Sequence, residues 1–99
     1  MIVVRNVFRL KFGKARDALA LWKEGRQIAE KTGTGGGMRA MTDLVGPFYT
    51  LVMEEQFESL AEMEKQFESE MGAEEWKAWY QKFVPLVDSG YREVFTVVE

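Results

Sequence analysis

The chain has 99 residues with 13 basic and 16 acidic side chains, giving a net charge of −3, and it contains no Cys and no His. The length suits one domain, near the lower limit for a self-sufficient core. The missing residue types exclude a disulfide framework, a thiol nucleophile, a Ser-His-Asp triad and a zinc finger. Any metal would need an all-oxygen site, and we predict neither a metal site nor a cofactor. Scattered basic residues argue against a nucleic-acid partner.

Targeting and membrane segments are not expected. Residues 1–9 lack the charged region followed by a long apolar run that is typical of a signal peptide. No apolar stretch approaches the roughly 20 residues that are needed to span a bilayer. We therefore expect a cytoplasmic protein without a membrane partner.

The predicted elements begin with a strand over residues 2–11, which is rich in Val, Ile, Leu and Phe and is ended by Gly13. Helical periodicity follows over residues 14–31. The apolar face of this helix carries Ala18, Leu21, Trp22, Gly25, Ile28 and Ala29. An amphipathic helix packed against a sheet is the structure that this pattern predicts.

A glycine-rich run at residues 32–37 ends the helix and predicts an irregular connector. It does not match a dinucleotide-binding fingerprint, because it precedes a strand and Met38 stands where the third glycine is required. Strand-like runs follow at residues 38–45 and 48–57. Gly46-Pro47 between them predicts a hairpin with a tight turn.

A capping box at residues 59–62 opens the next helix, which Gly72 interrupts. A second helical stretch is expected over residues 73–84, a turn at residues 88–90, and a last strand over residues 91–98. The apolar stripe of the first of these helices consists of Leu60, Met63, Phe67 and Met71.

The order of elements is β-α-β-β-α-β, with the second helix broken. Its natural solution is one α+β domain over residues 1–99, in which a four-stranded antiparallel sheet carries helices on one face. The other sheet face of a lone domain should be polar, yet the strands do not alternate cleanly. Apolar side chains stand on both faces of each strand, with Val3 and Val7 opposite Ile2, Val4, Phe8 and Leu10, Met41 and Val45 opposite Ala40 and Leu44, Phe48 and Val52 opposite Tyr49, Leu51, Met53 and Phe57, and Phe95 and Val97 opposite Val94 and Val98.

Burial of this second face against another copy of the chain explains the pattern, since a soluble monomer rarely exposes so large an apolar patch. A homodimer through the sheet face, most simply around a two-fold axis, is the prediction. Arg5 and Arg9 are then expected to pair with strand carboxylates such as Glu54 or Glu93 at the rim of the interface.

Three passages carry a resemblance to a known group: residues 8–15 (Phe-Arg-Leu-Lys-Phe-Gly-Lys-Ala), residues 55–60 (Glu-Gln-Phe-Glu-Ser-Leu) and the aromatic segment 76–90. With the order of elements, they resemble the dimeric α/β-barrel superfamily, including the antibiotic-biosynthesis monooxygenases, and most nearly its NIPSNAP-like branch. The resemblance covers nearly the whole chain. It implies a ferredoxin-like homodimer whose two sheets form a barrel, with a small pocket between sheet and helices in each subunit.

Some members of that superfamily oxygenate polyphenolic aromatics without a cofactor, and others bind and degrade haem. The haem-degrading relatives use an Asn on the first strand, a His and a Trp. Their Asn precedes the strand-ending Gly by the same seven positions that separate Asn6 from Gly13. Because this chain has no His, the resemblance does not extend haem degradation to it.

Two residues on the expected inner surface have a structural and a functional reading. Asn6 shares its strand face with Phe8 and Leu10, and a buried amide without partners costs about 1–3 kcal/mol. It either orients a ligand or is satisfied by backbone or a trapped water. Gly25, near the centre of a buried helix face, either allows close packing against the sheet or leaves space for a ligand.

Aromatic side chains on the helices also allow two readings, a packed core or the wall of a site for a flat apolar ligand. They are Trp22, Trp76, Trp79, Tyr80 and Phe83. Glu54 and Glu55 are adjacent strand residues and point to opposite faces, so they share neither a proton nor a metal. A lone buried Glu with a raised pKa would be a credible base.

Three functions fit these features. The first is a homodimeric protein that binds a small apolar or aromatic molecule through Asn6, Trp22, Gly25, Glu55, Trp76, Trp79, Tyr80 and Phe83. The second is a cofactor-independent monooxygenase of an aromatic substrate, with Asn6 as the catalytic residue that orients the substrate oxygen, Trp76 or Trp79 along the ring, and Glu55 or Tyr80 as base. The third is a structural dimer without a ligand site.

Overall fold

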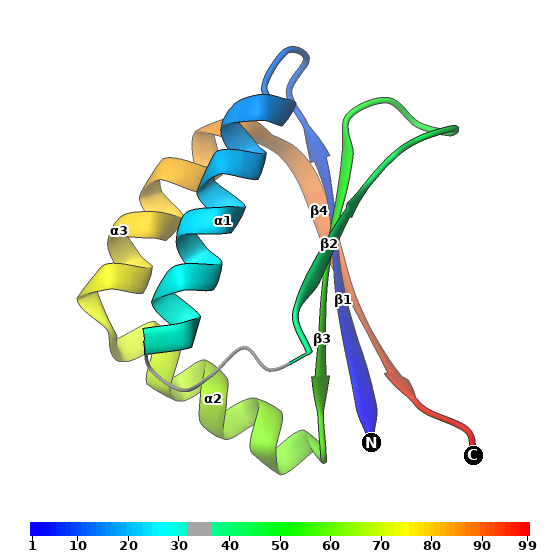
Figure 1. Ribbon diagram of the computed structural model, residues 1–99, viewed down its shortest axis with the longest axis vertical. Coiled ribbons are helices and arrows are strands. Elements are labelled where there is room, and N and C mark those ends of the chain that lie inside the picture. Colours follow the sequence, from blue (N-terminus) through cyan, green and yellow to red (C-terminus); the bar gives the residue numbers. More distant parts are fainter. Residues whose placement is uncertain (32–36) are drawn as a thin grey trace.

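The computed structural model describes residues 1–31 and 37–99, with the backbone alone described at Met71. In these ranges four strands form one antiparallel sheet in the order β2-β3-β1-β4, and the helices lie on one face of it (Figure 1). The predicted α+β, ferredoxin-like fold is confirmed. The elements in chain order are β1 (Ile2–Leu10), α1 (Ala15–Lys31), β2 (Arg39–Thr42), β3 (Thr50–Phe57), α2 (Leu60–Gly72), α3 (Glu74–Phe83), the 3₁₀ turn η1 (Val84–Leu86) and β4 (Val87–Thr96).

The helices follow the sequence prediction closely. In α1 the predicted apolar face supplies all the buried residues, namely Ala18, Gly25, Ile28 and Ala29. Ser59 caps α2 by accepting a hydrogen bond from the Glu62 N–H at 3.3 Å. After Gly72, the extended backbone of Ala73 separates α2 from α3, as the glycine predicts. The connector expected at residues 32–37 lies mainly outside the described residues.

The predicted tight hairpin is wrong, because β2 ends at Thr42 and β3 begins at Thr50. A longer loop joins them, held by the Thr50 N–H, which donates to the Asp43 side chain at 2.9 Å, and by the Thr50 hydroxyl, which donates to the Pro47 carbonyl at 2.9 Å. The apolar side chains that resembled strand residues are exposed in it, namely Leu44, Val45 and Phe48.

The turn predicted at residues 88–90 is also wrong, since these residues lie within β4, which ends before Val97. They pair with the end of β1, where Phe8 lies opposite Gly90, and the register shifts between Arg9 and Leu10. A Cβ built on Gly90 would lie 2.8 Å from a ring carbon of Phe8. Gly90 therefore permits close strand pairing there instead of forming a turn.

The apolar core on the helix face is divided into two clusters at opposite ends of the sheet. One consists of Leu10, Ala18, Leu51 and Phe83, and the other of Ile2, Val4 and Phe57. Asn6 lies on the same face of β1 between Val4 and Phe8. The polar side chain of Asn6 thus lies between the two apolar clusters.

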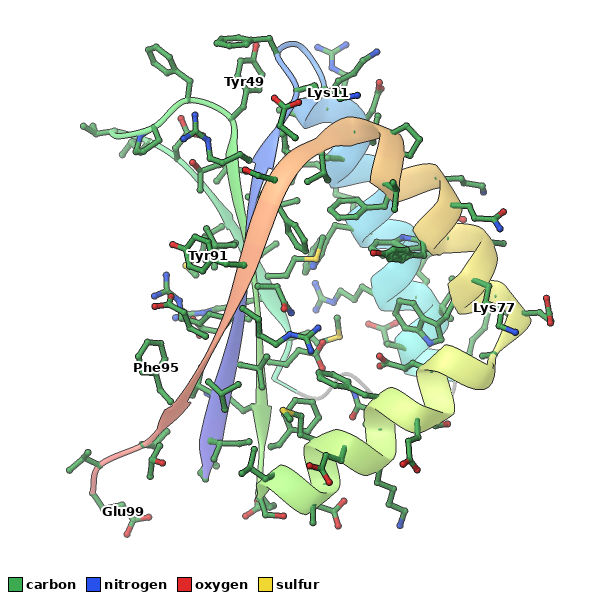
Figure 2. The ribbon with its side chains drawn as sticks, turned by 180° about the vertical axis from the view of Figure 1, so that it is seen from behind. Lys11, Tyr49, Lys77, Tyr91, Phe95 and Glu99 are labelled. Atoms are coloured by element: carbon green, nitrogen blue, oxygen red, sulfur yellow. The ribbon has the colours of Figure 1, made fainter. Side chains whose placement is uncertain are left out.

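The opposite face of the sheet carries apolar and paired charged side chains. Tyr91 and Phe95 project from it away from the helices (Figure 2) and are 60% and 47% exposed. As predicted, Arg5 pairs with Glu54 and Glu93, at 3.6 and 3.7 Å. The other predicted cation of this face forms no ion pair within the described ranges, because the cross-strand neighbours of Arg9 are the uncharged Thr50 and Ser89. None of the described helices is long and apolar enough to span a bilayer.

Candidate functional site

A hollow of about 1120 Å³ lies between the middle of the sheet and the helices. This volume lies slightly above the roughly 300–1,000 Å³ of common ligand sites, so the space has room for a small organic molecule. All eight predicted site residues lie on its wall: Asn6, Trp22, Gly25, Glu55, Trp76, Trp79, Tyr80 and Phe83. The sequence left open which face of β3 lines the pocket, and the structure shows that Glu55, and not Glu54, faces the hollow.

Asn6 supplies a polar group at the centre of this wall, and its partner is a side chain of β4. Arg92 lies opposite Asn6 in the strand register, and its Nε–H donates to the Asn6 Oδ1 at 2.7 Å. The guanidinium also lies over the ring of Phe67, 4.7 Å from the ring centroid. The amide oxygen of Asn6 therefore accepts from a cation that itself lines the hollow.

Two carboxyl groups form the acidic side of the hollow, Glu55 from β3 and Glu70 from α2. The Gln66 amide bridges them, donating at 3.0 Å to the Glu55 Oε2 and at 3.0 Å to the Glu70 Oε1. Burial, with the nearby charge of Glu70, raises the pKa of Glu55 to about 7, although the Gln66 hydrogen bond and the charge of Arg92 act to lower it. Burial likewise raises the pKa of Glu70. Near neutral pH, Glu55 can therefore both accept and release a proton.

Glu54 has an unrelated environment on the opposite face of the sheet. Only 9% of it is exposed, and its carboxylate accepts a hydrogen bond from the Arg39 Nε–H at 2.9 Å in addition to its ion pair with Arg5. The prediction that Glu54 and Glu55 point to opposite faces is confirmed. Within the described residues, no cluster of acidic side chains is placed to hold a metal ion.

The aromatic side chains of α3 serve both the core and the wall of the hollow. The Trp79 ring stacks on Phe83 with centroids 5.0 Å apart, and Trp76 packs edge-on against Trp79 at 5.7 Å. Phe83 is buried in the core cluster that also contains Leu10 and Leu51, and it contacts Phe8 edge-on. By contrast, Tyr80 is 56% exposed at the rim of the hollow.

Gly25 permits close packing, but against α3 and not against the sheet as predicted. A Cβ at this position would lie 3.0 Å from the indole nitrogen of Trp79. That indole N–H donates to the carbonyl of Leu21, one turn earlier in α1. The glycine thus seats the Trp79 ring on α1 and fixes one side of the hollow.

Trp22 carries an unsatisfied polar atom in this wall. Its indole nitrogen is buried and has no hydrogen-bond partner in the described part of the chain. The ring also contacts Arg26, whose guanidinium carbon lies 5.5 Å from the centroid. The candidate residues from α1 and α3 therefore combine apolar surface with indole groups.

Among the residues of the site that sequence reasoning missed are Phe67, Glu70 and Arg92, together with Gln66, which bridges the two carboxyl groups. Arg92 could have been found by counting back from Val94 in steps of two, since both face the helices. Glu70 follows Phe67 by one helical turn, but its acidic neighbours on α2 made it resemble a solvated residue. Only the packing of α2 against β3 shows that it approaches Glu55.

Comparison with known proteins supports the fold assignment. The chain matches the NIPSNAP family over residues 4–99. It is similar to a NIPSNAP family protein from Agrobacterium tumefaciens, with 19% identity, 99% of this chain and 93% of that chain covered, and a TM-score of 0.88. It is also similar to a NIPSNAP domain protein from Burkholderia xenovorans, with 18% identity, 99% of this chain and 95% of that chain covered, and a TM-score of 0.85.

A more distant similarity is to a solved structure described as an antibiotic biosynthesis monooxygenase. The identity is 16%, both chains are covered completely (100% each), and the TM-score is 0.72, which shows a shared fold. Among curated proteins, none matches the chain. The match of one family to residues 4–99 shows that the chain belongs to the NIPSNAP family.

Proposed function

We propose that the protein binds a small, largely aromatic molecule in the hollow between the sheet and the helices. The observation that carries this proposal is a single space walled by aromatic rings, with the hydrogen-bonded pair of Asn6 and Arg92 at its centre. Apolar walls with a few convergent polar groups are typical of small-molecule sites. A structural dimer without a ligand site would need this space to be filled by side chains.

The placement of the polar residues supports the same conclusion. Asn6, Glu55 and Arg92 occupy the middle of the helix face, where a protein selected for stability alone would place apolar side chains. Burial also disfavours the charged form of Glu55. A bound molecule that uses these groups gives a functional reason for keeping them there.

Fluorescence of the neutral probe 1-N-phenylnaphthylamine tests the proposal. Saturable enhancement is expected with the unmodified protein, and its loss is expected in Met53→Trp, because Met53 lies on the wall beside Asn6. Lys65→Trp, at an exposed position of α2 outside the hollow, is the matched control and should bind normally. Equal binding by a folded Met53→Trp variant would overturn the proposal.

A second candidate function is cofactor-independent oxygenation, and the environment of Glu55 favours it. A carboxylate whose pKa is about 7 can take a proton from an electron-rich anthrone at neutral pH. Dioxygen then oxidises the anion: a C–O bond forms at the deprotonated carbon and the O–O bond breaks. One oxygen remains as the product carbonyl. The other leaves as water with the proton returned by Glu55 and the second hydrogen of that carbon.

Asn6 and Arg92 lie where they can hold the oxygen of such a substrate anion. Oxygen uptake with anthrone is expected to exceed the spontaneous rate and to return to it in Glu55→Gln. Glu68→Gln, at an exposed position of α2, should keep the full rate. Uptake at the spontaneous rate with the unmodified protein, or unchanged uptake in Asn6→Ala, would contradict this function.

A second copy of the chain is the proposed partner for the outer face of the sheet. Tyr91, Phe95 and Val97 expose apolar surface there, while Arg5 and Glu54 on the same face are already paired within the chain. Burying this face therefore removes apolar area from water without leaving those charges unpartnered.

Light scattering after size exclusion is expected to give the mass of two chains. Phe95→Glu, at a position 47% exposed, should reduce it to one chain. Val98→Glu, at a position 90% exposed beyond the end of β4, should leave it unchanged. A monomeric unmodified protein at micromolar concentration would refute the dimer.

A further inference from the structure

We infer that the molecule held in the hollow is an aromatic acid whose carboxylate binds the guanidinium of Arg92. This inference rests on the proposed binding function and names the chemical class of its ligand. It begins from the geometry of Arg92, a residue of β4 that the sequence did not single out.

Arg92 is held from two directions within the chain. Its Nε–H donates to the Asn6 Oδ1 at 2.7 Å, and its guanidinium lies 4.7 Å from the centroid of the Phe67 ring. These contacts use the Nε edge and one face of the group. They fix the plane of the guanidinium while the two terminal nitrogens, which form the fork that matches a carboxylate, remain for a ligand.

Charge pairing distinguishes Arg92 from the other cations of the hollow. Arg26 pairs with Glu30 at 3.6 Å, and Lys77 pairs with Glu74 at 3.7 Å. Within residues 1–31 and 37–99, Arg92 forms no ion pair. Within these ranges it is thus the pocket-lining cation without a direct ion pair, although its charge acts on Glu55 and Glu70, and a ligand carboxylate can form that pair.

The surroundings of Arg92 indicate what the rest of the ligand is. Phe67 lies directly beneath the guanidinium, and the rings of Trp76 and Trp79 form the nearby wall. A flat ring attached to the carboxylate can pack against these side chains while its anionic end reaches Arg92. An aliphatic acid would leave this aromatic surface poorly matched.

Charged groups from every element around the hollow affect the binding of an acid. Glu55 comes from β3, Glu70 from α2, Arg26 from α1, Lys77 from α3 and Arg92 from β4. An ionised Glu55 repels the ligand carboxylate, whereas its protonated form does not and can donate a hydrogen bond. Because its pKa is about 7, binding of the acid should be accompanied by proton uptake and should weaken as the pH rises.

Paired probes test the inference: 2-naphthoate, which is an anion, and 2-naphthamide, which is neutral and nearly the same shape. Each is expected to displace 1-N-phenylnaphthylamine from the unmodified protein, and naphthoate is expected to bind about tenfold or more tightly than the amide. Arg92→Gln should abolish this preference, and Arg92→Lys should keep only part of it. Arg16→Gln removes a guanidinium at an exposed position of α1 outside the hollow and should leave the preference intact. Only the affinity for naphthoate should fall between about pH 6 and about pH 8.

The outcomes separate the two proposals. Equal affinities for the two probes, or a preference that survives in Arg92→Gln, would overturn the aromatic-acid inference while leaving binding in the hollow intact. Failure of all three aromatic compounds to bind, or binding that persists in Met53→Trp, would instead overturn the proposed binding function and the inference with it. Arg92 is exposed, so its variants are expected to fold, and circular dichroism checks this directly.

Discussion

Replacing Glu55 with Gln is expected to stabilise the protein above neutral pH and to have little effect in acid. Burial raises the pKa of this carboxyl from 4.5 to about 7. The folded protein therefore holds the proton more tightly than the unfolded chain does. Gln keeps an oxygen that can accept the hydrogen bond from the Gln66 amide, but it has no proton to lose.

The sign and size of the effect follow from linkage between protonation and folding. Below pH 4.5 Glu55 is protonated in both the folded and the unfolded protein, and its contribution to the free energy of unfolding is fully present. As the pH rises to about 7, the unfolded chain loses its proton first, so the free energy of unfolding falls across this window. At about 1.4 kcal/mol for each pKa unit, the total loss is about 3 kcal/mol. The advantage of Glu55→Gln should therefore grow by about 2–3 kcal/mol between about pH 5 and about pH 8.5.

Urea unfolding followed by tryptophan fluorescence measures this change, at one protein concentration so that association is constant. Glu68→Gln is the matched control, because Glu68 is exposed on the same helix that carries Glu70 and Gln66. Its effect should be the same at both pH values within about 0.5 kcal/mol. An equal stability difference for Glu55→Gln at the two pH values, or an NMR titration of Glu55 with a midpoint near 4.5, would refute the reasoning.

Three further substitutions test the core, the contact between α1 and α3, and the cap of α2. Leu51→Ala removes a side chain that is 0% exposed and should lower the free energy of unfolding by about 2–5 kcal/mol in urea titrations. Gly25→Ala places a Cβ 3.0 Å from the Trp79 indole, so overpacking of about 1–3 kcal/mol should outweigh the gain in helix propensity, with a shift in tryptophan emission. Ser59→Ala should cost about 1 kcal/mol by thermal melting, since it removes the α2 cap, whereas Ser69→Ala within α2 should cost less.

Local sequence patterns predict the inner face of this molecule well. Alternation in β1 places Asn6 beside Phe8, and helical periodicity places Gly25 and Trp79 on facing sides of α1 and α3. Those patterns reflect which side of each strand or helix is buried. The buried sides of the strands and of the helices face each other across the same interior. Part of the wall of the hollow could therefore be predicted from these patterns, whereas Glu70 and Arg92 were missed.

Loops and cross-element contacts could be predicted less well, for physical reasons. Leu44 and Phe48 have strand-like side chains, but the hydrogen bond from the Thr50 N–H to Asp43 closes a loop that leaves them exposed. Gly90 resembles a turn residue until the ring of Phe8 is placed against it. The approach of Glu70 to Glu55 depends on how α2 packs, which neither segment specifies alone.

The hollow also bears on how so short a chain is stabilised. The two apolar clusters lie at the ends of the helix face, and the polar group of Asn6, Glu55 and Arg92 lies between them. Those central positions contribute few of the apolar contacts that hold a small domain together. The remaining apolar surface of the sheet is on the outer face, where Tyr91 and Phe95 are exposed. A dimer through that face would bury additional apolar surface and so compensate for the apolar contacts that the polar residues of the site replace. The proposed partner and the proposed ligand therefore both follow from the way the core is divided.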